Sequence, residues 1–98
     1  MVKHVMIWSM RDGPHDKAAL LYEAKRSLES LSGKIDGLRA IKVSTSPLPS
    51  SGADAMVECI FDDPASLAEY KRHPLHAAIA NEYIKPFAKT YLSFDTEE

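Results

Sequence analysis

Only one cysteine, Cys59, occurs among the 98 residues, so the chain cannot form an internal disulfide. It also lacks an apolar run long enough for a membrane span, and it has no cluster of Lys and Arg that would indicate a nucleic-acid partner. The first residues lead directly into strand-like sequence, which predicts no signal peptide. We therefore expect a cytoplasmic protein that binds neither membranes nor nucleic acid.

The composition is that of an ordinary globular domain. Apolar residues make up 45% of the chain and charged residues 27%, with a net charge of −2, and such proportions are typical of folded soluble proteins. A chain of this length is long enough to bury one modest core. We expect a single domain that covers residues 1–98.

The predicted elements follow the order β-α-β-β-α-β. Strands are expected at residues 2–10, 38–45, 54–61 and 90–95, and an amphipathic helix at residues 15–32. A second helix is expected to start at Pro64, after the N-cap candidate Asp63, and to restart near Leu75. Residues 46–53 predict a loop, and the acidic tail is expected to fray. The buried stripe of the restarted helix is expected at Leu75, Ile79, Tyr83 and Phe87.

This order predicts an α+β, ferredoxin-like domain with a four-stranded antiparallel sheet and its helices on one face. An antiparallel sheet with one wet face should alternate between apolar and polar residues, but these strands are apolar on both faces. The apolar side chains expected on the face without helices are Val5, Ile7, Met56 and Ile60. A second copy of the sheet is the simplest cover for them, which predicts a face-to-face homodimer.

The segment His73-Pro74-Leu75-His76 is the most distinctive local motif. Pro74 disfavours helix at the residue before it and fits the first turn of a new helix. His76 would then lie near the positive end of the helix dipole, which disfavours its charged form and predicts a neutral imidazole that can act as a base. Tyr70, six residues earlier, is expected to share the same pocket. The alternative is that both histidines only cap the helix and pack against the sheet.

Tyr70, His76 and His4 together have the chemistry needed to remove a proton next to a carbonyl. His76 is the candidate base and Tyr70 the candidate donor to the developing enolate oxygen. His4, in the first strand, is expected to orient His76 or to hold a water. The alternative for His4 is a histidine at the edge of the core that bonds a backbone carbonyl.

Other site classes have weaker support in the sequence. A metal site made by His73, His76 and His4 would lack the usual carboxylate or cysteine ligand, so we expect no metal. Cys59 is expected on the core face and is read as a small inert apolar residue. Trp8 can line a cavity or fill the core. No cofactor-binding motif is visible, and no cofactor is expected.

The string Tyr70-x-x-His73-Pro74-x-His76, with His4, Met6 and Trp8 in the first strand, resembles the stress-responsive A/B barrel family, also called Dabb or dimeric α/β-barrel proteins. The resemblance extends over the whole chain and includes Phe61-Asp62 and Phe94-Asp95. It implies a homodimer in which two sheets form a barrel, with a cavity between helices and sheet in each protomer.

One member type of this family is a plant polyketide cyclase that closes a ring without a cofactor. The resemblance assigns its tyrosine, its catalytic histidine and its strand histidine to Tyr70, His76 and His4. The ligand-binding residues expected beside them are His73, Trp8, Val57, Ile79 and Tyr83. Residues 87–93 depart from that enzyme, so its alkyl pocket is not reproduced.

Three function classes follow. The first is a cofactor-free enzyme that binds a small, partly apolar organic ligand, with cyclase-like or lyase-like acid/base chemistry or, by analogy of fold alone, the activity of a small monooxygenase. The second is a non-catalytic ligand binder. The third is a stress-related homodimer with a structural role.

Overall fold

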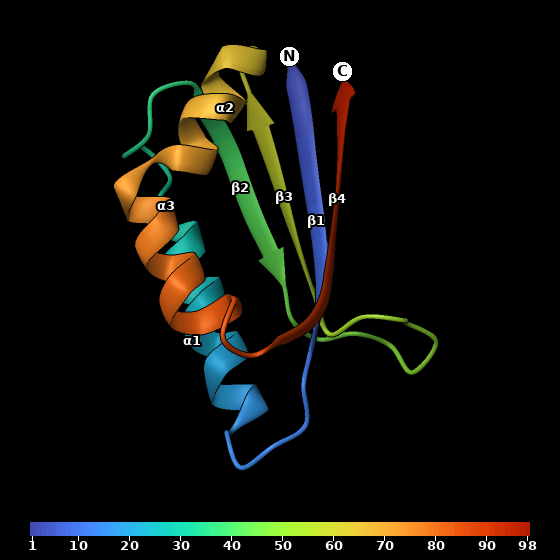
Figure 1. Cartoon of the computed structure of the whole chain (residues 1–98). Coiled ribbons are helices and arrows are strands. Elements are labelled where there is room, and N and C mark those ends of the chain that lie inside the picture. The colour runs from blue at the N-terminus through green and yellow to red at the C-terminus, as the bar shows by residue number, and fades with distance from the viewer.

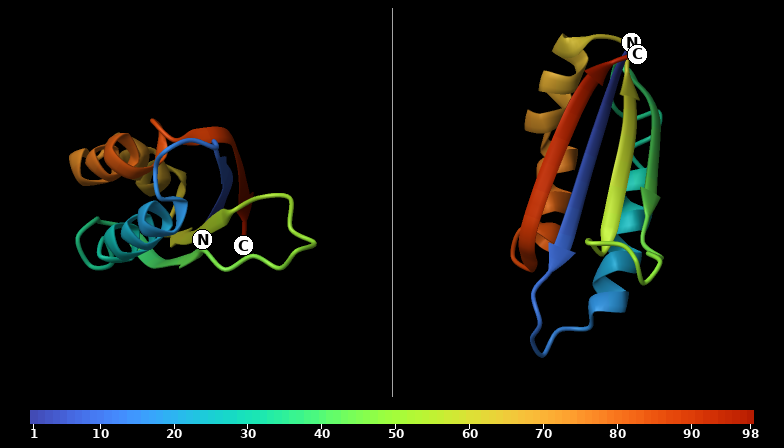
Figure 2. Two further views of the ribbon diagram at one scale, coloured as in Figure 1. Left: turned by 90° about the horizontal axis from the view of Figure 1, so that it is seen from below. Right: turned by 90° about the vertical axis from the view of Figure 1, so that its right-hand side faces the viewer.

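The computed structural model describes all residues from 1 to 98 and contains a four-stranded antiparallel sheet in the order β2-β3-β1-β4. The helices cover one face of this sheet and leave the other face open (Figure 1; Figure 2). The elements in chain order are β1 (Val2–Met10), α1 (Lys17–Glu29), β2 (Leu38–Ser44), β3 (Ala55–Phe61), α2 (Pro64–Arg72), α3 (Pro74–Ile79), the π-helical turn η1 (Ala80–Ile84) and β4 (Ala88–Glu97). The predicted ferredoxin-like fold is confirmed.

Side chains of the central strands alternate between the helix-covered face and the open face. The buried positions of β3 are Ala55, Val57, Cys59 and Phe61. His4 and Trp8 of β1 are buried on the same side, because His4 pairs with Cys59 and Trp8 with Ala55 in the antiparallel register. The core therefore lies between the sheet and the helices, and His4 is its one buried polar residue.

Helix α1 is shorter at both ends than the predicted range of 15–32. Asp16 is the N-cap, because its carboxylate accepts a hydrogen bond from the Ala19 amide at 3.1 Å. The helix ends at Glu29, and the chain then turns through Gly33, whose φ of +79° favours glycine. Leu31 is still buried within this turn, so the apolar period continues beyond the helical backbone.

The second helical region has the predicted break. Asp63 caps α2 through the Ser66 amide at 2.8 Å, and Pro64 occupies the first turn. Helix α3 restarts at Pro74 with His73 as its N-cap, and this helical restart is confirmed. The two short helices α2 and α3 are therefore separate and follow one another in the helix layer (Figure 1).

The predicted buried stripe of this region is shifted by one position from the most buried row, although three of its four residues pack against the core. Leu75 is 44% exposed, whereas Ala80 and Ile84 are buried against the core. These two residues follow His76 at steps of four, so the innermost row of the helix begins at His76. Ile79, Tyr83 and Phe87 pack beside this row and are partly buried.

Strand β4 is longer than predicted and reaches Glu97, so the expectation of a frayed acidic tail is wrong. Val2 pairs with Glu97, and the Glu98 amide donates a hydrogen bond to the Met1 carbonyl at 2.8 Å. Both termini thus lie at the same end of the sheet (Figure 1). The pairing extends because β4 pairs with β1 along the whole length of β1, from Val2 to Met10.

The open face of the sheet is apolar, as predicted. Leu92 and Phe94 of β4 are each 68% exposed there, next to Ile7 and Val5 of β1 in the strand register. Met56 and Ile60 of β3 are partly exposed on the same face. The loop between β2 and β3 projects beyond this face (Figure 2). No helix of the structure has the length and apolar character needed to cross a membrane.

Candidate functional site

A cavity of about 260 Å³ lies between the helix layer and the sheet. The lining residues come from β1, α1, β3, α2, the α3–η1 region and β4, and they are His4, Met6, Leu28, Val57, Tyr70, His76, Ala80, Ile84, Lys85 and Tyr91. This volume is below the range of about 300–1,000 Å³ that is typical of pockets for drug-sized molecules, so the cavity suits a compact ligand.

The cavity wall brings together Tyr70, His76 and His4. The Tyr70 and His76 rings are in contact, with centroids 4.3 Å apart and planes inclined by 41°. The His4 ring lies edge-on to Tyr70 with a centroid distance of 6.2 Å. The helix break between Tyr70 and His76 makes this possible, because a continuous helix would separate residues six apart by more than one turn and place them on different faces.

His4 is oriented by a carboxylate. Its Nδ1 lies 2.5 Å from Oδ1 of Asp95 on β4, which is paired with His4 in the strand register. In this arrangement Nδ1–H donates to Asp95, and Nε2 is left without a protein partner. The second oxygen of Asp95 accepts a hydrogen bond from Lys71 at 3.4 Å. The expected role of His4 as the residue that orients His76 is therefore not matched by a direct hydrogen bond, since its bonded partner is Asp95.

His76 is half-buried and is not committed to a structural hydrogen bond. Burial lowers the pKa of His76, and electrostatic interactions with His4, Lys85 and His73 act in the same direction. Hydrogen bonding to the Lys71 backbone acts in the opposite direction and raises the pKa of His76. No hydrogen bond of regular geometry reaches the buried Nδ1 of His76. A neutral imidazole is thus favoured near pH 7, and unpaired buried polar atoms of this kind are often found at functional sites.

Tyr70 is 1% exposed, and burial raises its pKa well above the usual range. Its hydroxyl therefore stays protonated and can donate a hydrogen bond. Cys59 is its neighbour, and burial raises the pKa of the Cys59 thiol to about 12, with the Tyr70 hydroxyl acting in the opposite direction. A thiol held in its neutral form is a poor nucleophile, which agrees with the sequence-based interpretation of Cys59 as inert.

The other residues predicted to bind ligand divide into two groups. Val57 lines the cavity. Trp8 belongs to the core, and Ile79 and Tyr83 pack against that core from outside the cavity wall. Ile79 and Tyr83 do not line the cavity, because the row of helical residues that faces it starts at His76 and passes through Ala80.

His73 lies away from the cavity and caps α3. Its Nδ1 accepts a hydrogen bond from the Leu75 amide at 3.1 Å. It borders a shallow polar depression together with Asp36, Asp63 and Glu69. No group of three or more His, Cys, Asp or Glu side chains is arranged to hold a metal ion.

Three polar residues of the site were not assigned from the sequence: Asp95, Lys85 and Tyr91. A period of two along β4 connects Tyr91 with Asp95, but the sequence does not say which face of the strand they share. Steps of four from His76 lead to Ala80 and Ile84 and do not reach Lys85, so the helical period gave no signal for this lysine.

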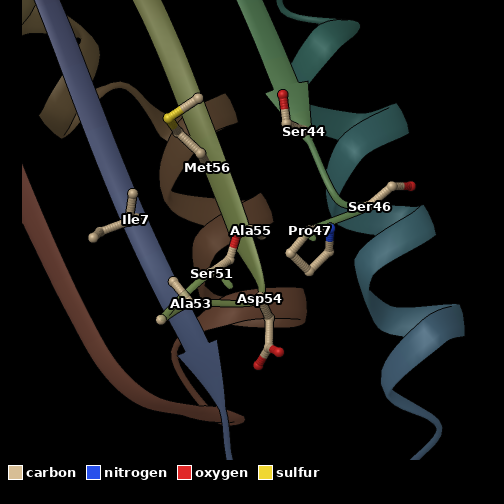
Figure 3. A pocket seen from close by; sticks show the side chains of 10 residues that line it. Ile7, Ser44, Ser46, Pro47, Ser51, Ala53, Asp54, Ala55 and Met56 are labelled. Atoms are coloured by element: carbon tan, nitrogen blue, oxygen red, sulfur yellow. The ribbon is translucent and has the colours of Figure 1, made fainter. Parts of the chain in front are cut away.

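A second cavity, of about 410 Å³, lies on the open side of the sheet beneath the β2–β3 loop (Figure 3). Ile7, Met56 and Ser44 stand side by side in the strand register and form its floor. Asp54 is its one ionisable residue, and its carboxylate accepts a hydrogen bond from the Met10 amide at 2.7 Å. This cavity lacks a free acid or base, whereas the cavity between helices and sheet is lined by the imidazoles of His4 and His76.

The family model of the stress responsive A/B barrel domain matches residues 2–98. The chain belongs to this family, as its Tyr-x-x-His-Pro-x-His string predicted. No curated protein sequence matches the chain.

Solved structures share the fold at low sequence identity. A dimeric protein of ferredoxin-like fold from Bacteroides fragilis is 24% identical with a TM-score of 0.90, and the match covers 99% of this chain and 95% of that one. A protein from Arabidopsis thaliana is 23% identical with a TM-score of 0.79, over 100% and 95% of the two chains. A hydroxynitrile lyase from Passiflora edulis is 15% identical with a TM-score of 0.77, over 97% and 90%. At these identities the likeness shows the fold alone.

Proposed function

We propose that this protein is a homodimer whose cavity between helices and sheet binds a small, partly apolar carbonyl compound and moves a proton on it without a cofactor. The contact of the Tyr70 and His76 rings in the wall of an otherwise largely apolar cavity carries this proposal. A neutral base beside a protonated phenol is the pairing that enolisation needs.

In the proposed reaction, a ring nitrogen of His76 takes the proton from the carbon next to the carbonyl. The electron pair of the C–H bond moves to the carbonyl oxygen, and the Tyr70 hydroxyl donates a hydrogen bond to the resulting enolate. The enolate carbon then attacks a second carbonyl of the same molecule, and the new alkoxide takes the proton back from His76. The attack of the enolate carbon on the second carbonyl would close a ring, as in a cyclase.

The reverse of such a carbon–carbon bond formation is a lyase reaction, and His76 would then deprotonate a hydroxyl group. The fold is compatible with lyase activity, since a hydroxynitrile lyase from Passiflora edulis shares it. His4, with Nδ1 bonded to Asp95, would provide a second oriented imidazole in the wall.

The dimer is part of the proposal because the open face needs a cover. Leu92, Phe94 and Ile7 form an exposed apolar surface on the side of the sheet without helices, and such surfaces mark interaction sites. Related structures from several bacteria are dimeric. A reducing, cytoplasmic setting is also proposed, since the one thiol is buried and unpaired.

Deuterium exchange tests the chemistry directly. Phenylacetone, a compact apolar ketone, is incubated with the protein in D₂O, and NMR follows the loss of the protons next to its carbonyl. We expect the protein to accelerate this exchange and His76→Ala to remove the acceleration. Mass spectrometry of small molecules that co-purify with the protein would identify the natural ligand.

Equal exchange with and without the protein would contradict the proposed chemistry. If phenylacetone or a co-purified molecule binds but no proton moves, the protein is a non-catalytic binder. An acceleration that survives both His76→Ala and Tyr70→Phe would place the chemistry elsewhere.

A further inference from the structure

Lys85 is a cation without a protein partner at the cavity. It directly follows η1 and lines the same wall as His76 and Tyr70. None of the ion pairs of the structure includes Lys85. The positive charge of Lys85 is one of the influences that lower the pKa of His76. The ammonium is therefore close to the reacting groups and free to bind a ligand.

The cavity wall contains no carboxylate that could neutralise Lys85. The carboxylate behind the wall, Asp95, is already bonded to His4 and Lys71. The wall therefore has one ammonium, two imidazoles and two phenols, and it has no negative side chain. An anionic ligand would restore the balance of charge, whereas a cationic ligand would face only repulsion or neutral groups.

The remaining walls are apolar and confine the body of the ligand. Met6, Leu28, Val57, Ala80 and Ile84 supply them. Lys85 and Tyr91 are exposed, so they mark the end of the cavity that opens to solvent. The polar end of a ligand thus belongs at the mouth, and its apolar part belongs against the sheet and α1.

We propose that the ligand is a small carbonyl compound with a carboxylate group, which the Lys85 ammonium binds at the mouth of the cavity with the Tyr91 hydroxyl as a second donor. This inference rests on the proposed function, since it names the class of the substrate for the same site. It places the carboxylate at the mouth and the carbonyl beside Tyr70 and His76. The enolisable carbon then lies between the two anchors.

A carboxylate fits this site better than a phosphate. Phosphate recognition in proteins uses bidentate Arg, clustered backbone amides or a helix N-terminus. The cavity contains no arginine, and no glycine lines it. One lysine and one hydroxyl suit a single negative charge.

Two probes of equal shape test the charge of the ligand. The anion 3-phenylpropionate and its neutral amide 3-phenylpropionamide are titrated separately into the protein, and NMR follows the resonances of His76, Tyr70 and Lys85. We expect the anion to bind about tenfold more tightly than the amide, which is the effect of one hydrogen bond to a charged group. Lys85→Met should remove this difference, and Lys85→Arg should keep most of it.

Lys89→Met is the matched control, because Lys89 is an exposed lysine of β4 that does not line the cavity. It changes the net charge equally and should leave both affinities unchanged. Equal affinities for the two probes, or an unchanged preference in Lys85→Met, would overturn the carboxylate assignment. Binding of neither probe would overturn it as well.

The outcome separates this inference from the proposed function. If phenylacetone exchanges its protons but the anion has no advantage, the chemistry stands and the carboxylate class fails. If the anion binds through Lys85 and no proton exchange occurs, the ligand class stands and the chemistry fails.

Discussion

His4 and Asp95 are 91 residues apart in the chain, yet Nδ1 of the histidine lies 2.5 Å from Oδ1 of the aspartate. They meet because β1 and β4, the first and last strands, pair in antiparallel register. This pair fixes which nitrogen of His4, a residue of the cavity wall, has no protein partner. The position of His4 in the cavity wall therefore depends on the pairing of the first strand with the last.

Asp95→Asn should change the tautomer of His4 while the fold is retained. The amide nitrogen of asparagine can donate to Nδ1, which moves the imidazole proton to Nε2 and reverses the hydrogen bonding offered to the ligand. We expect turnover or exchange activity to fall by more than about tenfold, as is common for residues that orient a reacting histidine. Proton–nitrogen NMR of the His4 ring measures the tautomer directly.

Glu97→Gln is the control, because Glu97 lies two residues farther along the same strand and is exposed. It should leave both the His4 ring signals and the activity unchanged. If the tautomer stays the same in Asp95→Asn, Asp95 has no positioning role.

His76→Ala and Tyr70→Phe should lose activity and keep the fold. Loss of a general base costs about 10²–10⁴-fold in rate, and loss of one oxyanion donor costs about 10²–10³-fold. Tyr70→Phe removes only a hydroxyl beside Cys59 and should cost about 1 kcal/mol of stability. Denaturant unfolding and deuterium exchange of phenylacetone measure the two effects.

A loss of more than about 3 kcal/mol in both variants would be large for single substitutions. Tyr70 and His76 would then be core and cap residues, and the proposed chemistry would lose its main support.

Stability should decrease on acidification because of His76. Its folded-state pKa lies below the ordinary value of 6.5, so the unfolded chain takes up a proton first as the pH falls. The contribution of neutral His76 is complete above pH 6.5 and is lost progressively as the pH falls through that value toward the folded pKa. Free energies of unfolding at pH 7.5 and 5 should differ more in the wild type than in His76→Gln.

Carboxylates also contribute to the pH dependence of stability, but they are present in both the wild type and His76→Gln, so their contribution cancels in the comparison. Asp95 is one such carboxylate. Burial raises its pKa, but its hydrogen bonds and charge interactions with His4 and Lys71 lower it, and the net shift is downward. Its stabilising contribution is present above the ordinary value of 3.8 and is lost at lower pH. An identical pH dependence in wild type and His76→Gln would contradict the assignment of a neutral His76.

Ile7→Lys should break the proposed homodimer. The change places a charge on the open face between Met56 and Leu92 in the strand register, and an uncompensated buried charge costs about 3–5 kcal/mol. We expect the dissociation constant to rise by more than about 100-fold. Size-exclusion chromatography with light scattering measures the change.

Tyr22→Lys provides the control, since Tyr22 is 62% exposed on α1, away from the open face. It should not affect assembly. A well-folded wild-type monomer at micromolar concentration would rule out the dimer.

The loop of residues 46–53 should exchange its amide protons rapidly. Its backbone has one internal hydrogen bond, from the Ser51 amide to the Leu48 carbonyl at 2.9 Å, and residues 46–52 are exposed. Hydrogen exchange followed by NMR should show protection only at Ser51 within this segment. Strong protection across the loop would reveal a contact with a second copy.

Much of the fold follows from local sequence signals. The caps at Asp63 and His73, each followed by proline, position the starts of α2 and α3, because backbone amides at a helix start need a side-chain acceptor. The alternation along β1 and β3 identifies the face that carries His4 and Val57, because the period of a strand is two. These rules act over a few residues, so they can be read without the structure.

The composition of the site was decided by tertiary structure. Ile79 and Tyr83 were expected in the cavity, but the helix presents His76, Ala80 and Ile84 instead. Each residue turns a helix by about 100°, so an error of one position rotates the predicted face by that angle. Asp95 reaches His4 only through strand register. The pairing of β1 with β4 and the rotation of the helix against the sheet are set by contacts between residues far apart in the chain.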